Sequence, residues 1–256
     1  MTGQKVSSSG ERLLIVIPAY REEEALPFAI RDLRQNGPEA DIVVIDDGSP
    51  DGTSAVARSL GCQVVSLPYN LGIGGAVQTG LIYAADNGYG FAIQFDADGQ
   101  HVASEIEKIL SVVRDGHADV AIGSRFLSEG GFKSNLARRM GIRLFQVVIS
   151  CAIRQKITDS TSGFRAFDRS AIRFLARDYP CDYPEVEAIV FLGKHGFGIK
   201  EVAVEMRERQ AGRSSIRPLH SVYYMVKVML AILMVVLRGS KQDTRNIKEK
   251  TAAHGL

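Results

Sequence analysis

The sequence predicts an α/β protein with a doubly wound, mostly parallel sheet. Short runs of branched apolar residues recur along the first half of the chain, helical segments separate them, and polar residues with glycine follow their ends. The chain has 256 residues, of which 45% are hydrophobic, and this is enough to bury the core of one large domain. We expect a flexible leader over 1–11, one folded domain over 12–217, a helix within 218–241 and a flexible tail over 242–256.

Charge and cysteine content narrow the functional class. The net charge is +2, and no polybasic tail or basic run with interleaved aromatic residues indicates a nucleic-acid surface. The cysteines, Cys62, Cys151 and Cys181, are odd in number and not at metal-ligand spacing, which predicts a reducing compartment and no disulfide framework. The polar first dozen residues lack the apolar core of a signal peptide, so we expect a cytoplasmic protein. From the charge pattern, we expect that it binds no nucleic acid.

The first predicted strand covers residues 12–17 and ends at Pro18, because proline interrupts a sheet ladder. Three glutamates at 22–24 then predict a helix start, where carboxylates favour the positive end of the helix dipole. Between the two elements, Tyr20 could stack on a flat ring, and Glu22 could accept a hydrogen bond from a base or a ribose. A purely structural role of Glu22 at the helix start is the alternative.

A second strand is predicted over 42–45, and Asp46 and Asp47 follow it in a loop rich in turn-forming residues. Such residues can form a simple loop, or the two carboxylates can bind ribose hydroxyls or base nitrogens. After a further helix and a strand over 63–66, residues 70–76 form a glycine-rich helix start. Their glycine spacing differs from that of a dinucleotide-binding fingerprint, so no redox cofactor is expected.

The stretch around which the chain is organised is 91–101, where an apolar strand over 91–95 is followed by Asp96, Asp98 and Gln100. Open α/β sheets bind ligands at the carboxyl ends of their strands. Two carboxylates one residue apart, a glycine turn and an amide oxygen offer the hard oxygen ligands that Mg²⁺ or Mn²⁺ prefers. Taken alone, the same residues could form only a polar turn.

A helix over 103–113 and a strand over 119–122 precede a segment that has no acidic residue from 130 to 158. Its basic residues are Lys133, Arg138, Arg139, Arg143, Arg154 and Lys156. Together with the apolar residues between them, they predict a basic amphipathic helix that would suit an anionic lipid surface. The alternative is an ordinary helix with a solvated charged face.

The rest of the chain supplies further candidate site residues. Residues 159–167 could line a pocket or turn into an edge strand, and residues 182–187 open a helix whose Glu185 or Glu187 could act as a general base. A half-buried strand is predicted over 199–206. The basic loop 207–215 carries Arg209 and Arg213, whose guanidinium groups match the oxygens of a diphosphate.

An apolar segment over 222–237 has only 16 residues and is interrupted by Lys227. It is shorter than the roughly 20 residues that cross a bilayer. We expect it to lie in the membrane interface, to pack on a membrane partner or to cover the core.

Six motifs resemble those of the family 2 glycosyltransferases, in the same order and with similar spacing. They are Pro18-Ala19-Tyr20-Arg21-Glu22, Val44-Ile45-Asp46-Asp47-Gly48-Ser49, Asp96-Ala97-Asp98-Gly99-Gln100, Gly123-Ser124-Arg125-Phe126, Thr161-Ser162-Gly163-Phe164-Arg165 and Arg209-x-x-Gly212. Within the family, the likeness is greatest to the polyprenyl-phosphate (dolichyl-phosphate) sugar synthases, and it runs from about residue 12 to about residue 217. Six ordered motifs are far more specific than any one of them.

The resemblance implies a GT-A fold for 12–217, a nucleotide-sugar donor and a divalent cation, Mg²⁺ or Mn²⁺, at the Asp-x-Asp motif. It implies that the donor is bound by Pro18, Ala19, Tyr20, Glu22, Asp46, Asp47, Asp96, Ala97 and Arg213. The implied metal ligands are Asp96, Asp98 and Gln100, and the implied acceptor-binding residues are Arg125, Arg139 and Ser162. The implied catalytic residues are Asp98, Arg125, Glu187 and Arg209.

Two departures from the synthases stand out. Where the synthases usually carry a lysine after the final Gly-x-Ser, this chain has Gly212-Arg213-Ser214-Ser215-Ile216. The stretch Tyr183-Pro184-Glu185-Val186-Glu187 is more similar to bacterial cell-surface polysaccharide glycosyltransferases, in which Glu185 or Glu187 could serve as a base on a sugar hydroxyl.

We therefore predict an inverting, metal-dependent glycosyltransferase that moves a hexose from a UDP-, GDP- or dTDP-linked donor to a polyprenyl phosphate. It would act peripherally at the cytoplasmic face of the membrane, alone, as a homo-oligomer or with a small membrane protein. One alternative acceptor is a sugar hydroxyl in surface polysaccharide synthesis. A second alternative, a sugar nucleotidyltransferase, would need a glycine-rich basic signature after the first strand, which this chain does not have there. A third, a non-catalytic nucleotide-binding scaffold, is disfavoured by the intact Asp96, Asp98 and Arg209.

Overall fold

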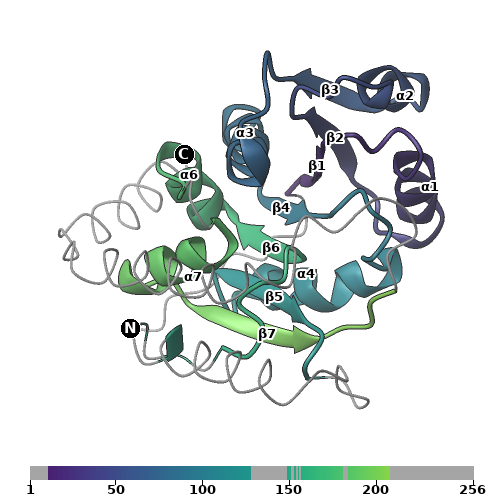
Figure 1. The fold of residues 1–256 in the computed structure, drawn as a ribbon. Coiled ribbons are helices and arrows are strands. Elements are labelled where there is room, and N and C mark those ends of the chain that lie inside the picture. The colour runs from purple at the N-terminus through teal and green to yellow at the C-terminus, as the bar shows by residue number, and fades with distance from the viewer. Residues whose placement is uncertain are drawn as a thin grey trace, which may run out of the picture.

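The computed structural model describes residues 11–127, 149–150, 153, 155, 157–180 and 184–207, and one sheet runs through them. Its strands are β1 Leu13–Ala19, β2 Asp41–Asp46, β3 Gln63–Ser66, β4 Phe91–Gln94, β5 Val120–Ser124, β6 Arg165–Asp168 and β7 Ile199–Ala203. They are ordered β3-β2-β1-β4-β6-β5-β7, as Figure 1 shows. All neighbouring pairs are parallel except those of β6, which runs antiparallel to β4 and β5. The predicted mostly parallel sheet is confirmed.

Helices cover both faces of the sheet. They are α1 Leu26–Asn36, α2 Thr53–Ser59, α3 Gly72–Asp86, α4 Ile106–Arg114, α6 Arg169–Arg177 and α7 Pro184–Lys194, with a short 3₁₀ helix, η1 Ala103–Glu105, before α4. The apolar residues of α3, α6 and α7 pack in one cluster on one face, and those of α1, α2 and α4 pack in another on the opposite face. The helices that the glycine-rich stretch 70–76 and residues 182–187 predict are therefore present as α3 and α7.

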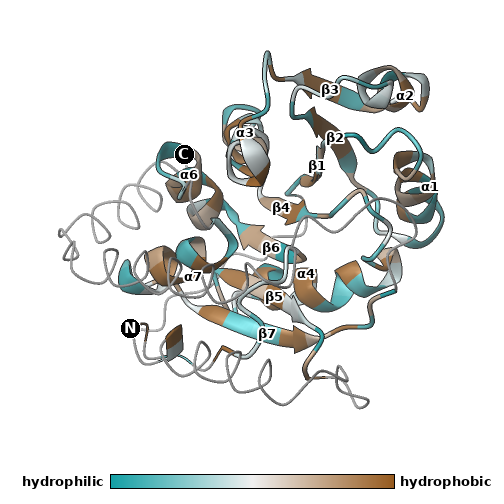
Figure 2. Cartoon of the chain, viewed as in Figure 1, coloured by the Kyte–Doolittle hydropathy of each residue, from teal (hydrophilic) through white to brown (hydrophobic). Residues whose placement is uncertain are grey.

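Strand β1 shows why the fold has two cores. Along it, Leu14 and Val16 belong to the cluster with α3, whereas Leu13, Ile15 and Ile17 belong to the cluster with α1. Successive strand side chains point to opposite faces, so a strand covered on both sides reads as an unbroken apolar run. Figure 2 shows apolar residues along the strands and more polar ones on the outer sides of the helices.

Helix α3 lies very close to β1. A Cβ added to Gly80 would come within 2.1 Å of Val16 Cγ1, a distance that no packed side chain can adopt. Glycine at this position therefore allows the helix backbone to rest directly on the strand that precedes the candidate site.

Two predictions near the first strand are wrong, namely that the strand stops at Pro18 and that a helix begins at the glutamates 22–24. Strand β1 passes through Pro18 and ends at Ala19. Proline is tolerated because the pairing of β1 with β4 stops at Val16, so no hydrogen bond to β4 is lost at Pro18. The glutamates at 22–24 lie in a turn, and α1 begins only at Leu26, with no acidic residue in its first turn. Glu23 instead accepts a hydrogen bond from the Gly52 N–H at 2.7 Å, which ties this turn to the loop after β2.

The second half of the chain also differs in detail. Residues 159–167 do not lead into an edge strand, because β6 lies between β4 and β5 inside the sheet. The strand predicted over 199–206 is β7, which ends at Ala203, and Met206 forms an isolated bridge with His101. Residues 1–10 of the predicted leader 1–11, most of the basic segment 133–156, and the predicted apolar helix and tail after 207 lie outside the described residues.

Candidate active site

The predicted site residues follow strands that end at the same edge of the sheet. Tyr20 follows β1, Asp46 ends β2, Asp96 follows β4 and Arg125 follows β5. These four strands point the same way, β5 because both it and β4 run antiparallel to β6, so their carboxyl ends meet at one edge. Because β6 runs the other way, Ser162, which precedes it, lies at this edge too. We call it the carboxyl edge.

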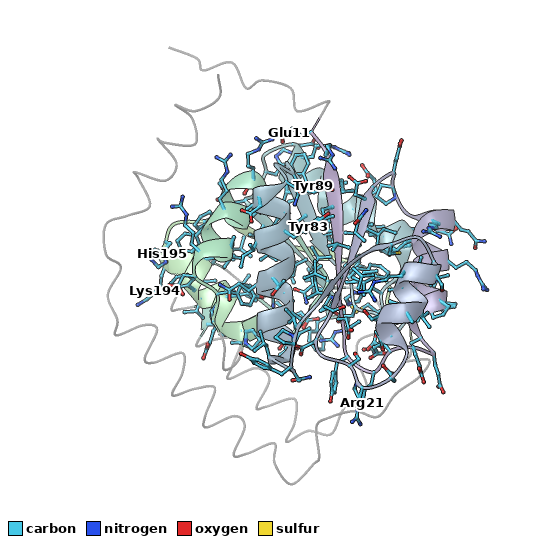
Figure 3. The ribbon with its side chains drawn as sticks, turned by 90° about the horizontal axis from the view of Figure 1, so that it is seen from above. Glu11, Arg21, Tyr83, Tyr89, Lys194 and His195 are labelled. Carbon is cyan, nitrogen blue, oxygen red and sulfur yellow. The ribbon has the colours of Figure 1, made fainter. Side chains whose placement is uncertain are left out.

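The carboxyl edge and the opposite edge of the sheet lie at opposite ends of the molecule. Figure 3 shows Arg21 at one end of the molecule and Glu11 at the other. Arg21 comes directly after Tyr20 on the loop from β1, so it marks the carboxyl edge.

The loops after β1 and β2 are fastened to each other. The Asp47 N–H donates to the Ala19 carbonyl at 2.9 Å, and the Arg21 N–H donates to Ser49 Oγ at 3.1 Å. Arg21 has a φ of 58°, in the left-handed region that residues with a side chain rarely adopt. This backbone holds Tyr20 in an exposed position, with 41% of its surface accessible, where a planar group could stack on it.

Asp46 and Asp47 are both buried but have different surroundings. Asp46 Oδ1 accepts a hydrogen bond from the Ser49 N–H at 3.0 Å. The oxygens of Asp47 accept hydrogen bonds from the N–H groups of Leu71 and Gly72 at 2.7 and 2.9 Å. Burial raises the pKa of Asp47, although the two N–H donors work against the shift. Asp47 therefore fixes the start of α3 beside the site.

Asp96 places an uncompensated oxygen at the carboxyl edge. Its side chain is one-third exposed (33%), yet Oδ1 is buried and has no hydrogen-bond partner among the described residues. Gly163 lies directly against this carboxylate, since a Cβ added there would come within 2.8 Å of Asp96 Oδ2. Asp98 is buried, and its Oδ1 accepts a hydrogen bond from the Gln100 N–H at 3.0 Å. Ala97 between them is buried in the apolar cluster with α1 and α4.

His101, a residue that the sequence did not indicate as part of the site, contacts both the backbone and the carboxylate of Asp96. The Asp96 N–H donates to His101 Nδ1 at 2.9 Å, and Nε2 lies 3.5 Å from Asp96 Oδ2. The ring stacks on Phe164 with centroids 4.7 Å apart. Burial lowers the pKa of His101, while Asp96 and Asp98 oppose that shift. Because Nδ1 accepts a hydrogen bond, the imidazole is neutral with its proton on Nε2.

Arg125 is held by an aspartate from a distant part of the chain. Its Nε and Nη2 donate to the two carboxylate oxygens of Asp159, both at 3.0 Å. Ser162 is buried, and its Oγ accepts a hydrogen bond from the Phe164 N–H at 3.3 Å. Arg165 is fully buried and donates to the carbonyls of Ser160, Ser162 and Glu185.

The structure separates the two glutamates of α7. The carboxyl group of the half-buried Glu185 lies in the electrostatic field of Arg165, Asp96 and Arg125. Burial raises the pKa of Glu185, Arg165 lowers it, and Asp96 raises it further. Glu187 is buried, with 6% of its surface accessible. The Glu185 carboxyl group therefore interacts electrostatically with Asp96 and Arg125 at the carboxyl edge.

The chain that leads to the predicted diphosphate clamp is fastened beside the Asp-x-Asp loop. The Arg207 N–H donates to the Gln100 carbonyl at 2.8 Å. The Arg207 guanidinium donates to Asp32 on α1 at 2.8 Å, and the same carboxylate accepts from the Ala103 N–H at 3.1 Å. Arg209 is only two residues beyond Arg207 in the sequence, but Arg209, Arg213 and Arg139 lie outside the described residues.

We expect Asp32→Asn to lower the free energy of unfolding by about 1–3 kcal/mol at pH 7, because it weakens charged hydrogen bonds of a buried carboxylate. Burial raises the pKa of Asp32, but Arg207, Asn36 and the Ala103 N–H together leave it below its usual value. A lowered carboxyl pKa stabilises the fold above the unfolded value of about 4, and this stabilisation is lost as pH falls through the folded value.

Chemical denaturation of wild type and Asp32→Asn between pH 7 and pH 3 measures this effect. The difference between the two should shrink below about pH 4. Asp115→Asn, at an exposed residue after α4, is the control and should stay within about 0.5 kcal/mol of wild type. A difference that does not change with pH would contradict the assignment.

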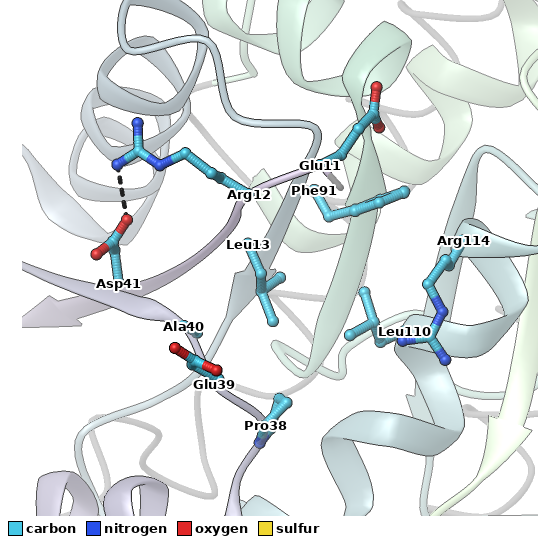
Figure 4. Close-up of a pocket in the computed structure, with 10 residues that line it drawn as sticks. All are labelled: Glu11, Arg12, Leu13, Pro38, Glu39, Ala40, Asp41, Phe91, Leu110 and Arg114. Atoms are coloured by element: carbon cyan, nitrogen blue, oxygen red, sulfur yellow. Dashed lines mark hydrogen bonds and ion pairs between the residues drawn. The ribbon is translucent and has the colours of Figure 1, made fainter. Parts of the chain in front are cut away.

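A cavity of about 550 Å³ lies at the opposite edge of the sheet, between the starts of β1, β2 and β4 and the end of α4. Figure 4 shows its lining, with Arg12 paired to Asp41 at 2.7 Å and Leu13, Phe91 and Leu110 as apolar groups. None of its lining residues is a predicted site residue, so the cavity is separate from the carboxyl edge.

The donor set at Asp96 fits a hard divalent cation. Among the described residues there is no cluster of three or more His, Cys, Asp or Glu side chains with metal-binding geometry. Asp96 and Asp98 are nevertheless neighbouring carboxylates, and the buried, unpartnered Oδ1 of Asp96 is an atom that a cation would satisfy. Two protein carboxylates with additional ligands from a bound phosphate are a common arrangement for Mg²⁺.

Several known proteins are similar to this chain. The model of "Glycosyl transferase family 2" matches residues 14–175. The polyprenol monophosphomannose synthase of Mycolicibacterium smegmatis is 31% identical over 214 residues, which cover 80% of this chain and 80% of the relative. The undecaprenyl-phosphate mannosyltransferase of Micrococcus luteus is 32% identical over 216 residues, which cover 79% of this chain and 86% of the relative. A UDP-N-acetylglucosamine–dolichyl-phosphate N-acetylglucosaminyltransferase of Methanococcus voltae is 30% identical over 213 residues, which cover 75% and 84%.

Among solved structures, glucosyl-3-phosphoglycerate synthase of Mycobacterium tuberculosis has a similar fold. Its complex with Mg²⁺ and uridine diphosphate gives a TM-score of 0.69 at 19% identity, covering 92% of this chain and 83% of that one. Its complex with Mn²⁺, UDP-glucose and phosphoglyceric acid gives a TM-score of 0.68 at 19% identity, with the same coverage. At this identity the likeness concerns the fold alone.

Proposed function

Because the chain belongs to glycosyl transferase family 2 and is a glycosyltransferase with the GT-A fold, we propose that it transfers a hexose from a nucleotide-diphosphate sugar to a polyprenyl phosphate. Transfer proceeds with inversion, and Mg²⁺ or Mn²⁺ is the cofactor. The observation that supports this most directly is the buried Oδ1 of Asp96, which has no hydrogen-bond partner in the described part of the chain, on a carboxylate that interacts electrostatically with Arg125.

The donor occupies the part of the carboxyl edge formed by β1 and β2. In this proposal Tyr20 stacks on the base, while Pro18, Ala19, Glu22 and Asp46 shape the pocket for base and ribose. Asp47 contributes through the loop that it fixes before α3. The relatives named above use mannose in two cases and N-acetylglucosamine in one, so they support a hexose donor and no single sugar.

The diphosphate lies over the loop after β4. Asp96, Asp98 and Gln100 would hold the divalent cation, whose positive charge stabilises the departing nucleoside diphosphate when it is bound. His101 holds the Asp96 backbone and lies against its carboxylate, and Gly163 leaves room for that carboxylate. We assign Arg209 and Arg213 to the other side of the diphosphate, as arginine forks that match its oxygens.

The acceptor phosphate meets Arg125, with Ser162 and Arg139 nearby in this assignment. A phosphate oxygen is already anionic, so attack on the sugar needs no strong base. The names of the relatives support such an acceptor, since all three act on a polyprenol, undecaprenyl or dolichyl phosphate. In-line attack from the side opposite the leaving diphosphate gives inversion.

The electrostatic interaction of Glu185 with Asp96 favours one alternative acceptor, a sugar hydroxyl. A hydroxyl must lose a proton during attack, and a carboxylate with a raised pKa is suited to accept it. The sequence left Glu185 and Glu187 open as this base. Glu187 is buried and Glu185 is half-buried, so Glu185 is the candidate base in this alternative.

We expect Glu185→Gln to retain transfer to polyprenyl phosphate within about tenfold, because a phosphate acceptor needs no general base. If a hydroxyl is the acceptor, loss of the base should lower kcat by roughly 10²–10⁴-fold. Glu107→Gln, at an exposed residue of α4, is the control, and circular dichroism of both variants verifies their folding. A large loss in Glu185→Gln with polyprenyl phosphate as acceptor would contradict the phosphate assignment.

We further propose a peripheral location at the cytoplasmic face of the cell membrane. The support is the chemistry of the relatives, whose named acceptors are lipid phosphates. Among the described residues, no helix has both the length and the apolar character needed to span a bilayer.

The direct test combines purified chain, Mg²⁺ or Mn²⁺, UDP-, GDP- and dTDP-linked hexoses, and detergent-dispersed polyprenyl phosphate. We expect sugar in the lipid product, release of a nucleoside diphosphate, and an inverted anomeric centre by NMR. Release of pyrophosphate would indicate a nucleotidyltransferase, and donor binding by calorimetry without any product would indicate a non-catalytic scaffold. Either result would overturn the proposal.

A further inference from the structure

The buried carboxylate of Asp159 lies directly behind Arg125. It accepts hydrogen bonds from Arg125 Nε and Nη2 at 3.0 Å each, and a third from the Arg125 backbone N–H at 3.2 Å. The Asp159 side chain is 0% exposed, whereas that of Arg125 is 35% exposed. One partner of this pair is thus inside the protein, and the other reaches the surface of the carboxyl edge.

A second set of contacts fixes Asp159 itself. Glu201 on β7 accepts hydrogen bonds from the backbone N–H groups of Thr158 and Asp159, and another from Thr158 Oγ1 at 2.8 Å. Thr161 Oγ1 lies 3.2 Å from both Asp159 Oδ1 and Arg125 Nη2. The aspartate is therefore fixed through its main chain by β7 and through its side chain by Thr161.

This arrangement restricts Arg125 in a way that an exposed arginine is not restricted. A guanidinium bound through two parallel N–H···O bonds has its plane and direction fixed, and a buried carboxylate cannot exchange that contact for water. Burial alone lowers the pKa of Arg125, but the hydrogen bonds to Asp159 raise it in net, so the cation stays charged. The ordering is complete before any ligand arrives, which reduces the entropy lost on binding.

We propose that Asp159 is a positioning residue that aims the Arg125 guanidinium at the phosphate of the acceptor. The inference rests on the proposed function for the identity of that phosphate, and it adds a residue that acts only through Arg125. Asp159 touches neither substrate nor cation in this assignment. Its substitution should therefore weaken the use of the acceptor and leave the donor site unchanged.

A double-mutant cycle of Asp159→Asn and Arg125→Ala tests this coupling. We expect Asp159→Asn to raise the KM for polyprenyl phosphate by about 10-fold or more, as a lost charged hydrogen bond does. The affinity for UDP-, GDP- or dTDP-linked hexose, measured by calorimetry without acceptor, should change by less than about twofold. The double variant should be no worse than Arg125→Ala alone.

Two further variants complete the experiment. Glu201→Gln keeps the shape of the group that fixes the Asp159 backbone, and it should raise the acceptor KM by a smaller factor than Asp159→Asn. Glu107→Gln, in the exposed ion pair with Arg114 on α4, is the control and should leave both substrates unaffected. If Asp159→Asn does not fold, Glu201→Gln and its combination with Arg125→Ala provide the same coupling measurement.

The outcomes distinguish the two proposals. Additive effects of Asp159→Asn and Arg125→Ala, or equal losses for donor and acceptor, would overturn the positioning role while the proposed function stands. Wild-type chain that neither binds nor uses polyprenyl phosphate would overturn both.

Discussion

Asp96→Asn is expected to lower kcat/KM for sugar transfer by at least about a thousandfold. The substitution keeps the shape of the side chain but removes the negative charge that would hold a divalent cation beside the leaving diphosphate. Removal of a single group that stabilises developing charge commonly costs 10²–10³-fold, and loss of a cation adds to this. Because Oδ1 has no hydrogen-bond partner among the described residues, the fold should lose little.

Steady-state transfer over a range of Mn²⁺ concentrations measures this effect, and thermal unfolding measures the stability. Asp115→Asn, an exposed carboxylate after α4, is the control and should retain full activity. In wild type, Mn²⁺ with a nucleoside diphosphate should raise the melting temperature, since both bind only the native state, and Asp96→Asn should show almost none of this rise. Undiminished transfer by Asp96→Asn would refute the role of the Asp-x-Asp loop.

Gly163→Ala is expected to lower activity by about a hundredfold, although the added group is a single methyl. Its Cβ would lie 2.8 Å from Asp96 Oδ2 and 3.0 Å from Gln94 Nε2, and both distances are shorter than normal packing allows. The Asp96 carboxylate must therefore move, and displacements of about 1 Å at a reacting centre can cost about a hundredfold. The Mn²⁺ concentration that gives half-maximal activity should rise as well.

Gly198→Ala provides a matched control. There the nearest atom to an added Cβ is Asp119 Oδ2 at 3.7 Å, an ordinary contact distance. We expect wild-type activity and a small change in melting temperature for this variant. If Gly163→Ala loses activity without any change in its Mn²⁺ dependence, the effect does not act through Asp96.

The approximate positions of the strands, and the edge of the sheet at which the site lies, can be predicted from the sequence. Both depend on a local pattern of apolar runs followed by polar residues. A strand buried on both faces must be an unbroken apolar run, and β1, β2 and β4 are such runs. Where each run ends, polar residues lie at the carboxyl edge of a parallel sheet, which is why Tyr20, Asp46 and Asp96 were predicted at one edge. Errors arose at Pro18 and at the glutamates 22–24, where neighbouring strands and loops outweigh local preference.

Contacts between distant residues were decided only by the tertiary structure. Periodicity predicts that a residue is buried but does not name its partner, so nothing in the sequence pairs Asp159 with Arg125 or Asp32 with Arg207. For the contact between His101 and Asp96, the sequence offered one indication, which is that the two residues are only five positions apart.

By itself, then, the sequence determined the type of fold, the family motifs and the residues that lie at the carboxyl edge. The tertiary structure decided that Gly163 lies against Asp96, that Glu185 interacts electrostatically with Asp96, and that the Arg207 N–H is hydrogen-bonded to the Gln100 carbonyl. The physical reason is that local pattern reports which face of an element is buried. Side-chain contacts depend on how separate elements pack, including the antiparallel insertion of β6 between β4 and β5.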